Sequence, residues 1–107
     1  MKIEHIGIAV KSIANSSDLY EKLLGSASYK SELVASESVN TSFFKVGENK
    51  IELLEATHPD SAIAKFIDKK GEGIHHIAFD VEDILAEMAR LKLPLFLNSL
   101  VRNRCYS

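Results

Sequence analysis

A short pattern built around a histidine occurs twice in this chain, at residues 4–13 and again at residues 75–84. His5 in the first copy matches His76 in the second, and each copy alternates apolar with other residues, as a β-strand does. Small side chains follow each histidine on the same strand face, beginning with Gly7 in the first copy, and they leave room above the strand. Because neutral imidazole is the commonest metal ligand in proteins, the repeat predicts two imidazoles around one cavity.

The elements that must position these histidines follow from the spacing of apolar residues. After the first strand, apolar residues at helical spacing predict a helix over 12–24, which Gly25 is placed to end. Alternating patterns then predict further strands, and Gly and Asn in the last connection favour a tight turn. The first half therefore reads β-α-β-β-β, with strands at 3–10, 28–34, 39–46 and 50–55 and the turn at 47–49.

The second half of the chain repeats the strand and helix that begin the first half, but not the strands that follow them. Residues 56–73 form a connection that holds a short helix over 62–70, with Asp60 or Ser61 able to cap it. A strand over 74–81 and a helix over 82–92 follow, but the three later strands of the first half barely recur. All fifteen acidic residues lie at or before Glu87. Chance, or a different origin of the last residues, would explain why no acidic residue follows Glu87. In either case the second module is expected to be incomplete.

The overall composition excludes several classes of protein. A chain of 107 residues is expected to form one domain. Its net charge of −2 gives no electrostatic case for nucleic acid or for an anionic membrane as a partner. No apolar run approaches the roughly 18 to 20 residues that span a bilayer. The start of the sequence lacks the layout of a signal peptide, and the single Cys105 cannot form an internal disulfide, so we expect a cytoplasmic protein.

Several stretches resemble the vicinal-oxygen-chelate superfamily of glyoxalases, bleomycin-resistance proteins and dioxygenases, and within it the methylmalonyl-CoA epimerases. The matching stretches are residues 3–10, 19–25, 50–55, 60–67 and 71–78, of which the last two are the most specific. The resemblance covers roughly residues 2–92. It implies an α+β fold of paired βαβββ modules in one domain of residues 1–107, with the first module at 1–55, a connecting helix at 56–73 and an incomplete second module at 74–107.

The resemblance also implies residue roles. His5 matches the metal-binding histidine of the first module, His76 matches that of the second, and Glu52 matches a ligand on the last strand of the first module. Their ligating atoms are then expected within about 5 Å of one another. The ion would be Co, Zn, Mn, Ni or Mg, among which the sequence does not choose. The family's fourth ligand, a glutamate on the final strand that is thought to be a catalytic base, has no acidic counterpart after Glu87, so the catalytic residues stay unassigned.

The function implied by the resemblance is metal-dependent epimerisation of 2-methylmalonyl-CoA through an enolate, impaired in this chain because the final glutamate is missing. The implied partners are an acyl-CoA substrate and a second copy of the chain. Two alternatives stay open on the same scaffold. One is lactoylglutathione lyase or another metal-dependent enzyme of the superfamily, and the other is a non-catalytic ligand-binding module.

Other polar residues receive plainer interpretations. His75 is expected to face away from His76 and to support it or to pack, and His58 is expected to be a solvated loop residue. The lysines of the connecting helix are expected to be solvated, and neither Glu37 nor Glu48 has evidence for a base role. The homodimer is expected to cover an unpaired sheet edge. The apolar residues available for that contact are Leu93, Leu95, Phe96, Leu97, Leu100 and Val101.

Overall fold

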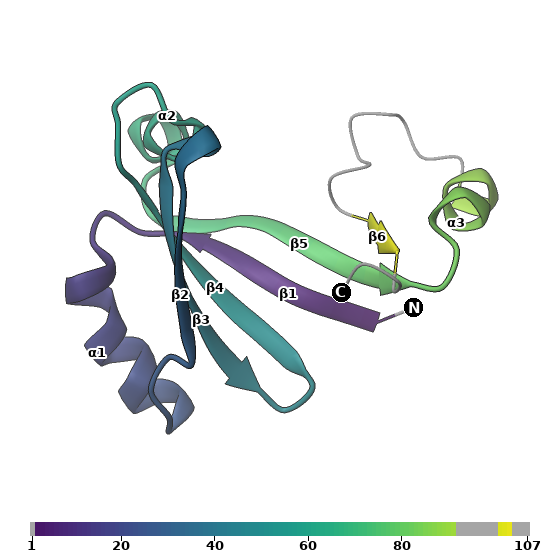
Figure 1. Ribbon diagram of the computed structural model, residues 1–107, viewed down its shortest axis with the longest axis horizontal. Coiled ribbons are helices and arrows are strands. Elements are labelled where there is room, and N and C mark those ends of the chain that lie inside the picture. The colour runs from purple at the N-terminus through teal and green to yellow at the C-terminus, as the bar shows by residue number, and fades with distance from the viewer. Residues whose placement is uncertain (1, 92–100, 104–107) are drawn as a thin grey trace.

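The computed structural model describes residues 2–91 and 101–103, which form one sheet with helices packed on it (Figure 1). The predicted strands and helices are present, with β2 beginning two residues later than expected. A short 3-10 helix, η1, and the strand β6 were not predicted. The elements in chain order are β1 Lys2–Ala9, α1 Ile13–Leu24, β2 Lys30–Val34, η1 Ala35–Glu37, β3 Val39–Val46, β4 Asn49–Ala56, α2 Ala62–Lys70, β5 Gly73–Val81, α3 Ile84–Leu91 and β6 Val101–Asn103.

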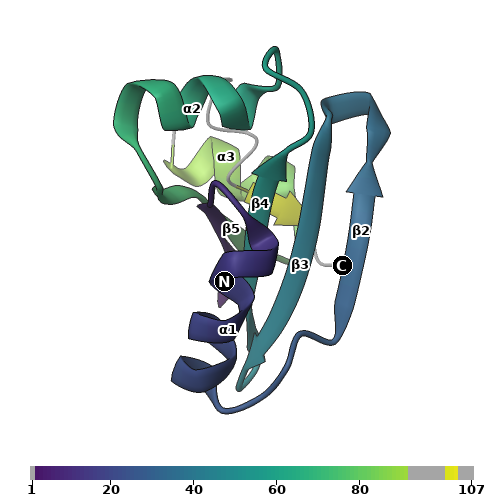
Figure 2. The same cartoon turned by 90° about the vertical axis from the view of Figure 1, so that its left-hand side faces the viewer.

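The sheet has six strands in the order β2-β3-β4-β1-β5-β6. The two strands of the sequence repeat, β1 and β5, lie side by side and antiparallel at its centre. On the outer side of each lies a parallel neighbour, β4 beside β1 and β6 beside β5. Figure 2 shows β2 at one free edge, next to β3. The arrangement confirms the α+β fold, in which two β-α units pack with approximate twofold symmetry.

The two faces of the sheet carry different apolar clusters because side chains alternate along each strand. One face carries Val10, Phe44 and Leu53, and the half-buried residues of α1 pack against them. The opposite face carries Ala9, Val39 and Leu54, which pack with residues of α2. Figure 1 shows these two helices on either side of the sheet near one end. The face under α2 is the face of His5 and Gly7, so α2 closes one end of the site and leaves the rest of that face accessible.

The helix ends follow the capping chemistry of the sequence. The Ser12 hydroxyl accepts a hydrogen bond from the N–H of Asn15, and Gly25 ends α1 with a left-handed backbone at φ 81°. Of the two predicted caps of α2, Ser61 is the one that serves, since its hydroxyl accepts from the N–H of Ile63. The last helix begins at Ile84 rather than at residue 82, because the Asp83 carboxylate accepts from the backbone N–H of Ala86.

Candidate metal centre

The site is built on one row of paired residues that runs across three strands. Gly7 of β1 pairs with Glu52 of β4 on one side and with His76 of β5 on the other. Paired residues on neighbouring strands point to the same face, so Glu52 and His76 flank a residue that has no side chain. His5 stands two positions earlier in β1 and therefore shares that face. The three predicted ligands thus come from three adjacent strands.

Two β-bulges interrupt the pairing of β1 with β5, and each one lies beside a histidine that is predicted to bind the metal. The register passes from Ile3 to His5 without pairing Glu4, and it passes from His76 to Ile74 without pairing His75. An extra residue in a strand breaks the alternation of side chains between faces. Glu4 and His75 consequently contact the histidine that follows each of them, although strict alternation would turn them away.

The ligand atoms of the three residues converge. His5 Nε2 lies 2.9 Å from His76 Nε2. The Glu52 carboxylate oxygen Oε1 lies 3.4 Å from His5 Nε2 and 3.5 Å from His76 Nε2. The His5 side chain is 7% exposed, that of Glu52 14% and that of His76 24%, so the group is open to solvent chiefly from the side of His76.

The geometry and the donor types both fit a divalent metal ion. Atoms that share one ion with bonds of about 2.0–2.2 Å lie about 2.8 to 3.6 Å apart, depending on the coordination geometry. The three separations above match that range, and within the described residues this is the group of His, Cys, Asp or Glu side chains placed to hold an ion. Two imidazoles with one carboxylate suit Zn, Co, Ni or Mn better than Ca.

A buried carboxylate fixes the orientation of the first imidazole. Glu4, which is 6% exposed, lies with Oε1 2.9 Å from His5 Nδ1 and with Oε2 3.2 Å from the Lys50 ammonium group. Burial acts to raise the pKa of Glu4, but the hydrogen bonds and charges of His5 and Lys50 outweigh it and lower that pKa. The ionised carboxylate only accepts, so His5 Nδ1 carries the proton of this hydrogen bond, and in the neutral imidazole Nε2 is then the nitrogen with a lone pair for the centre.

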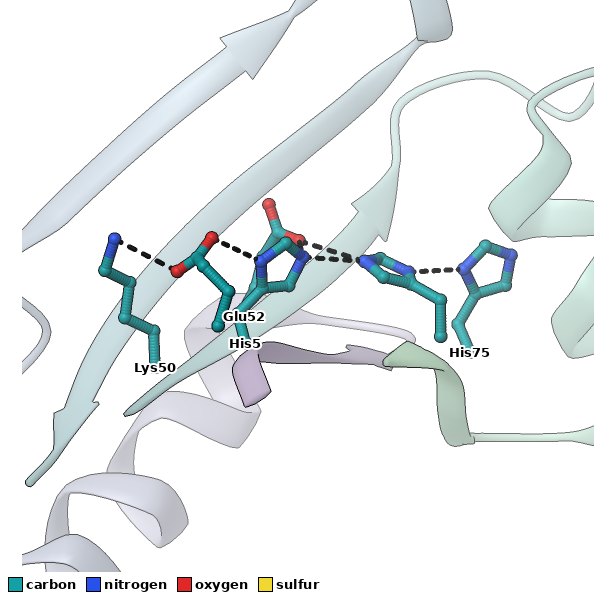
Figure 3. A network of polar contacts seen from close by, with 6 residues as sticks. His5, Lys50, Glu52 and His75 are labelled. Atoms are coloured by element: carbon teal, nitrogen blue, oxygen red, sulfur yellow. Dashed lines mark hydrogen bonds and ion pairs between the residues drawn. The ribbon is translucent and has the colours of Figure 1, made fainter. Parts of the chain in front are cut away.

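The second imidazole contacts another histidine instead of a carboxylate. His75 Nδ1 lies 2.9 Å from His76 Nδ1, and the His75 ring packs edge-on against Phe66 of α2. Burial first, and then the charge of His76, lowers the pKa of His75. The expectation that His75 faces away from His76 is wrong, because the bulge turns it toward its neighbour. Figure 3 shows the resulting line of polar contacts from Lys50 to His75.

Two cavities meet at the metal centre, and Glu52 and His76 line both of them. The larger, of about 630 Å³, has lysine ammonium groups and two aromatic rings in its wall. The smaller, of about 150 Å³, has an apolar wall with the Glu37 carboxylate beside it. The apolar wall consists of Val34, Val39, Leu54 and Ile63. Sequence reasoning assigned no role to Glu37, since it lies in η1, between strands, where no periodicity indicates a direction.

The other predicted residues lie apart from the centre. His58 is exposed in a loop, where its ring nitrogen accepts a hydrogen bond from the N–H of Asp60. Among the residues that the structure describes, the lysines of α2 line neither of the two cavities. The segments 92–100 and 104–107 lie outside the described residues, and with them most of the apolar residues expected in the dimer contact. The described strand β6, Val101–Asn103, contains no carboxylate for a fourth ligand.

No helix in the described segments has the length and apolar character to pass through a membrane.

Comparisons with known proteins agree with this geometry. Residues 4–93 match the model of the Glyoxalase/Bleomycin resistance protein/Dioxygenase superfamily. The uncharacterized protein YqjC of Bacillus subtilis is 46% identical over 78 residues, which are 73% of this chain and 56% of that protein. The ethylmalonyl-CoA/methylmalonyl-CoA epimerase of Cereibacter sphaeroides is 36% identical over 92 residues, which are 85% of this chain and 69% of that enzyme.

A solved structure is similar over the same region. The S115T variant of Streptomyces coelicolor methylmalonyl-CoA epimerase, in complex with 2-nitronate-propionyl-CoA, superposes with a TM-score of 0.75 at 33% identity. The match covers 86% of this chain and 68% of that one. This chain therefore spans about half to two thirds of the length of the proteins that it resembles.

Proposed function

Because this chain belongs to the Glyoxalase/Bleomycin resistance protein/Dioxygenase superfamily, we propose that it is a metal-dependent epimerase of 2-methylmalonyl-CoA or a close homologue of that thioester. The observation that carries the proposal is the convergence of His5, Glu52 and His76 at the meeting point of two unlike cavities. Relatives named as epimerases of methylmalonyl-CoA support the choice of substrate.

The proposed reaction removes the proton between a thioester and a carboxylate and returns it on the other face. Its difficulty is the negative charge that develops on the thioester oxygen as the proton leaves. A divalent ion held by His5, Glu52 and His76 would act as a Lewis acid that stabilises this charge. The protein's own part is to hold the three ligands in place, to bind the two ends of the substrate and to move the proton.

The two cavities suit the two ends of such a substrate. The larger one is lined by Lys30, Lys45 and Lys50. Because Lys30 pairs with Glu32 and Lys50 pairs with Glu4, Lys45 is the lysine that we expect to meet a phosphate of coenzyme A. The aromatic rings of this cavity, Tyr29 and Phe43, lie 6.3 Å apart and offer apolar surface to the rest of the carrier. The smaller, apolar cavity has room for an alkyl group of one or two carbons on the carbon that loses the proton.

Glu37 is our candidate for a base on one face of that carbon. It lines the small cavity together with Glu52 and His76, and its side chain is exposed, so it can exchange its proton with water. The turn that carries it is fixed, because the N–H of Thr57 donates to the carbonyl of Ser38 at 2.8 Å. A general base must come within hydrogen-bond reach of the proton that it removes, and we propose that Glu37 does so across this cavity.

Exchange of the α-proton of methylmalonyl-CoA into heavy water tests the proposal. The purified chain is assayed with Co²⁺ and again with a chelator, and mass spectrometry follows the uptake of deuterium. We expect uptake with the metal and a return to the uncatalysed rate with the chelator. Metal binding without uptake would favour another metal-dependent activity, such as the lyase, and the absence of both would favour a non-catalytic binding module.

A further inference from the structure

The imidazole of His76 lies directly across the backbone of Gly7. A methyl group built on Gly7 would lie 2.2 Å from Cε1 of that ring, 2.6 Å from Nδ1 and 2.7 Å from Nε2. Non-bonded heavy atoms approach favourably only to about 3.5–4.0 Å. The ring therefore occupies the space that any side chain at position 7 would need.

We propose that Gly7 is a positioning residue of the metal centre, because its missing side chain lets the His76 ring cross β1 and reach His5 and Glu52. The inference rests on the proposed metal site. Gly7 is the middle residue of the row in which Glu52 and His76 stand on the two neighbouring strands. A side chain between them would separate the two ligands, which now lie 3.5 Å apart.

The requirement is for space and not for an unusual backbone. The glycines with positive φ are Gly25, Gly47 and Gly71, and Gly7 is not among them. Alanine at position 7 is therefore compatible with the strand backbone. β1 is held by hydrogen bonds to β4 on one side and β5 on the other, whereas the His76 side chain is partly exposed. The ring is thus the part that yields, and the fold is expected to survive the substitution.

The test compares Gly7→Ala with Gly73→Ala. Gly73 lies on β5, pairs with Ala9 of the same strand β1, and has no atom within 4 Å of a built methyl group, so it is a matched control. Co²⁺ binding is measured by calorimetry and by the visible absorption of the bound ion, and folding by thermal melting. We expect Gly7→Ala to weaken Co²⁺ binding about 10- to 100-fold with little change in melting temperature. Gly73→Ala should bind as the unchanged chain does.

The variant His76→Ala shows whether the effect passes through the imidazole. Once that ring is absent, the three atoms nearest to the substituted methyl group are gone, so adding Gly7→Ala should leave Co²⁺ affinity nearly unchanged. A further loss in the double variant would mean that Gly7 acts through the backbone and would overturn the inference. Equal affinity of Gly7→Ala and the unchanged chain would also overturn it while leaving the metal site standing.

A measurement without metal separates the two proposals. In the metal-free protein, we expect a nuclear Overhauser cross-peak between a Gly7 Hα and the Hε1 of His76, which Gly7→Ala should abolish. If the unchanged chain lacked this cross-peak, the His76 ring would not lie across β1 at Gly7, and the inference would be refuted regardless of metal binding. A chain that shows the cross-peak but binds no Co²⁺ would refute the metal site and, with it, the role assigned to Gly7.

Discussion

The substitution Glu4→Gln should weaken metal binding although Glu4 is not itself a predicted ligand. Glutamine keeps the shape of the side chain and an oxygen that accepts from His5 Nδ1–H, but it removes the negative charge. An ionised partner on the far nitrogen makes the imidazole a stronger donor to a metal, and it holds the tautomer that leaves Nε2 bare. In this protein the carboxylate lies 2.9 Å from that nitrogen and is nearly fully buried, so little solvent screens its charge.

The expected size of the effect follows from these contacts. Loss of a partner that orients a ligand typically lowers metal affinity about 10- to 100-fold, which corresponds to about 1.4–2.7 kcal/mol. A hydrogen bond to a charged group contributes about 1.5–3 kcal/mol to stability, and because glutamine retains the acceptor, we expect a loss of about 1 kcal/mol in the free energy of unfolding. Most of the change should therefore appear in metal affinity.

The matched control is Glu32→Gln. Glu32 lines the same cavity and pairs with Lys30 at 2.7 Å, so the substitution removes the same charge near the centre. It does so on an exposed pair, which contributes about 0–1 kcal/mol. Zn²⁺ affinity is measured by competition with a chromophoric chelator, and unfolding by urea. If the two variants bound Zn²⁺ equally well, the total charge near the centre, and not the contact of Glu4 with His5, would govern binding. The argument that Glu4 fixes the tautomer of His5 would then be wrong.

Three further predictions concern other residues. Glu37→Gln should lower α-proton exchange by about a hundred- to ten-thousand-fold without changing Co²⁺ affinity, and loss of metal binding in that variant would contradict a base role. Ser61→Ala should lower the free energy of urea unfolding by about 1 kcal/mol, since it removes the cap of α2. The lowered pKa of Glu4 stabilises the fold fully above its ordinary value of 4.5, and this contribution is lost as the pH falls through the lowered value. Between about pH 5 and pH 3, the free energy of urea unfolding should therefore fall less in Glu4→Gln than in the unchanged chain. An equal fall in both proteins would contradict a lowered pKa of Glu4.

The sequence was sufficient to predict the central part of this fold, because the same pattern encodes β1 and β5. Strict alternation placed His5 and Gly7 on one face, and the structure keeps them there, opposite Val10. Gly25 also predicted the end of α1, whereas the helix begins at Ile13, one residue later than expected, with Ser12 as its cap. These predictions succeed because they depend on local chemistry, which a strand or a helix transmits unchanged.

The supporting residues could not be predicted, because they depend on bulges. A single unpaired residue reverses which face a side chain takes, and nothing in the alternation around Glu4 or His75 indicates that reversal. The position of Glu37 could not be predicted for a related reason, since a short turn between strands sets the direction of its side chain. The module boundaries at residues 55 and 73 and the homodimer stay predictions.

The two bulges are themselves related by the repeat. Glu4 precedes His5 as His75 precedes His76, and each is the residue that the pairing of β1 with β5 omits. The approximate twofold symmetry therefore gives each ligand histidine a polar partner from the preceding position, but the partners differ in kind. A buried carboxylate supports His5 with a charge, whereas a second imidazole, whose pKa is lowered, supports His76. We therefore expect His5 to be the fixed, strongly donating ligand of the proposed metal site. We expect His76, which lines both cavities and is the more exposed of the two, to be the proposed ligand that adjusts when a substrate binds.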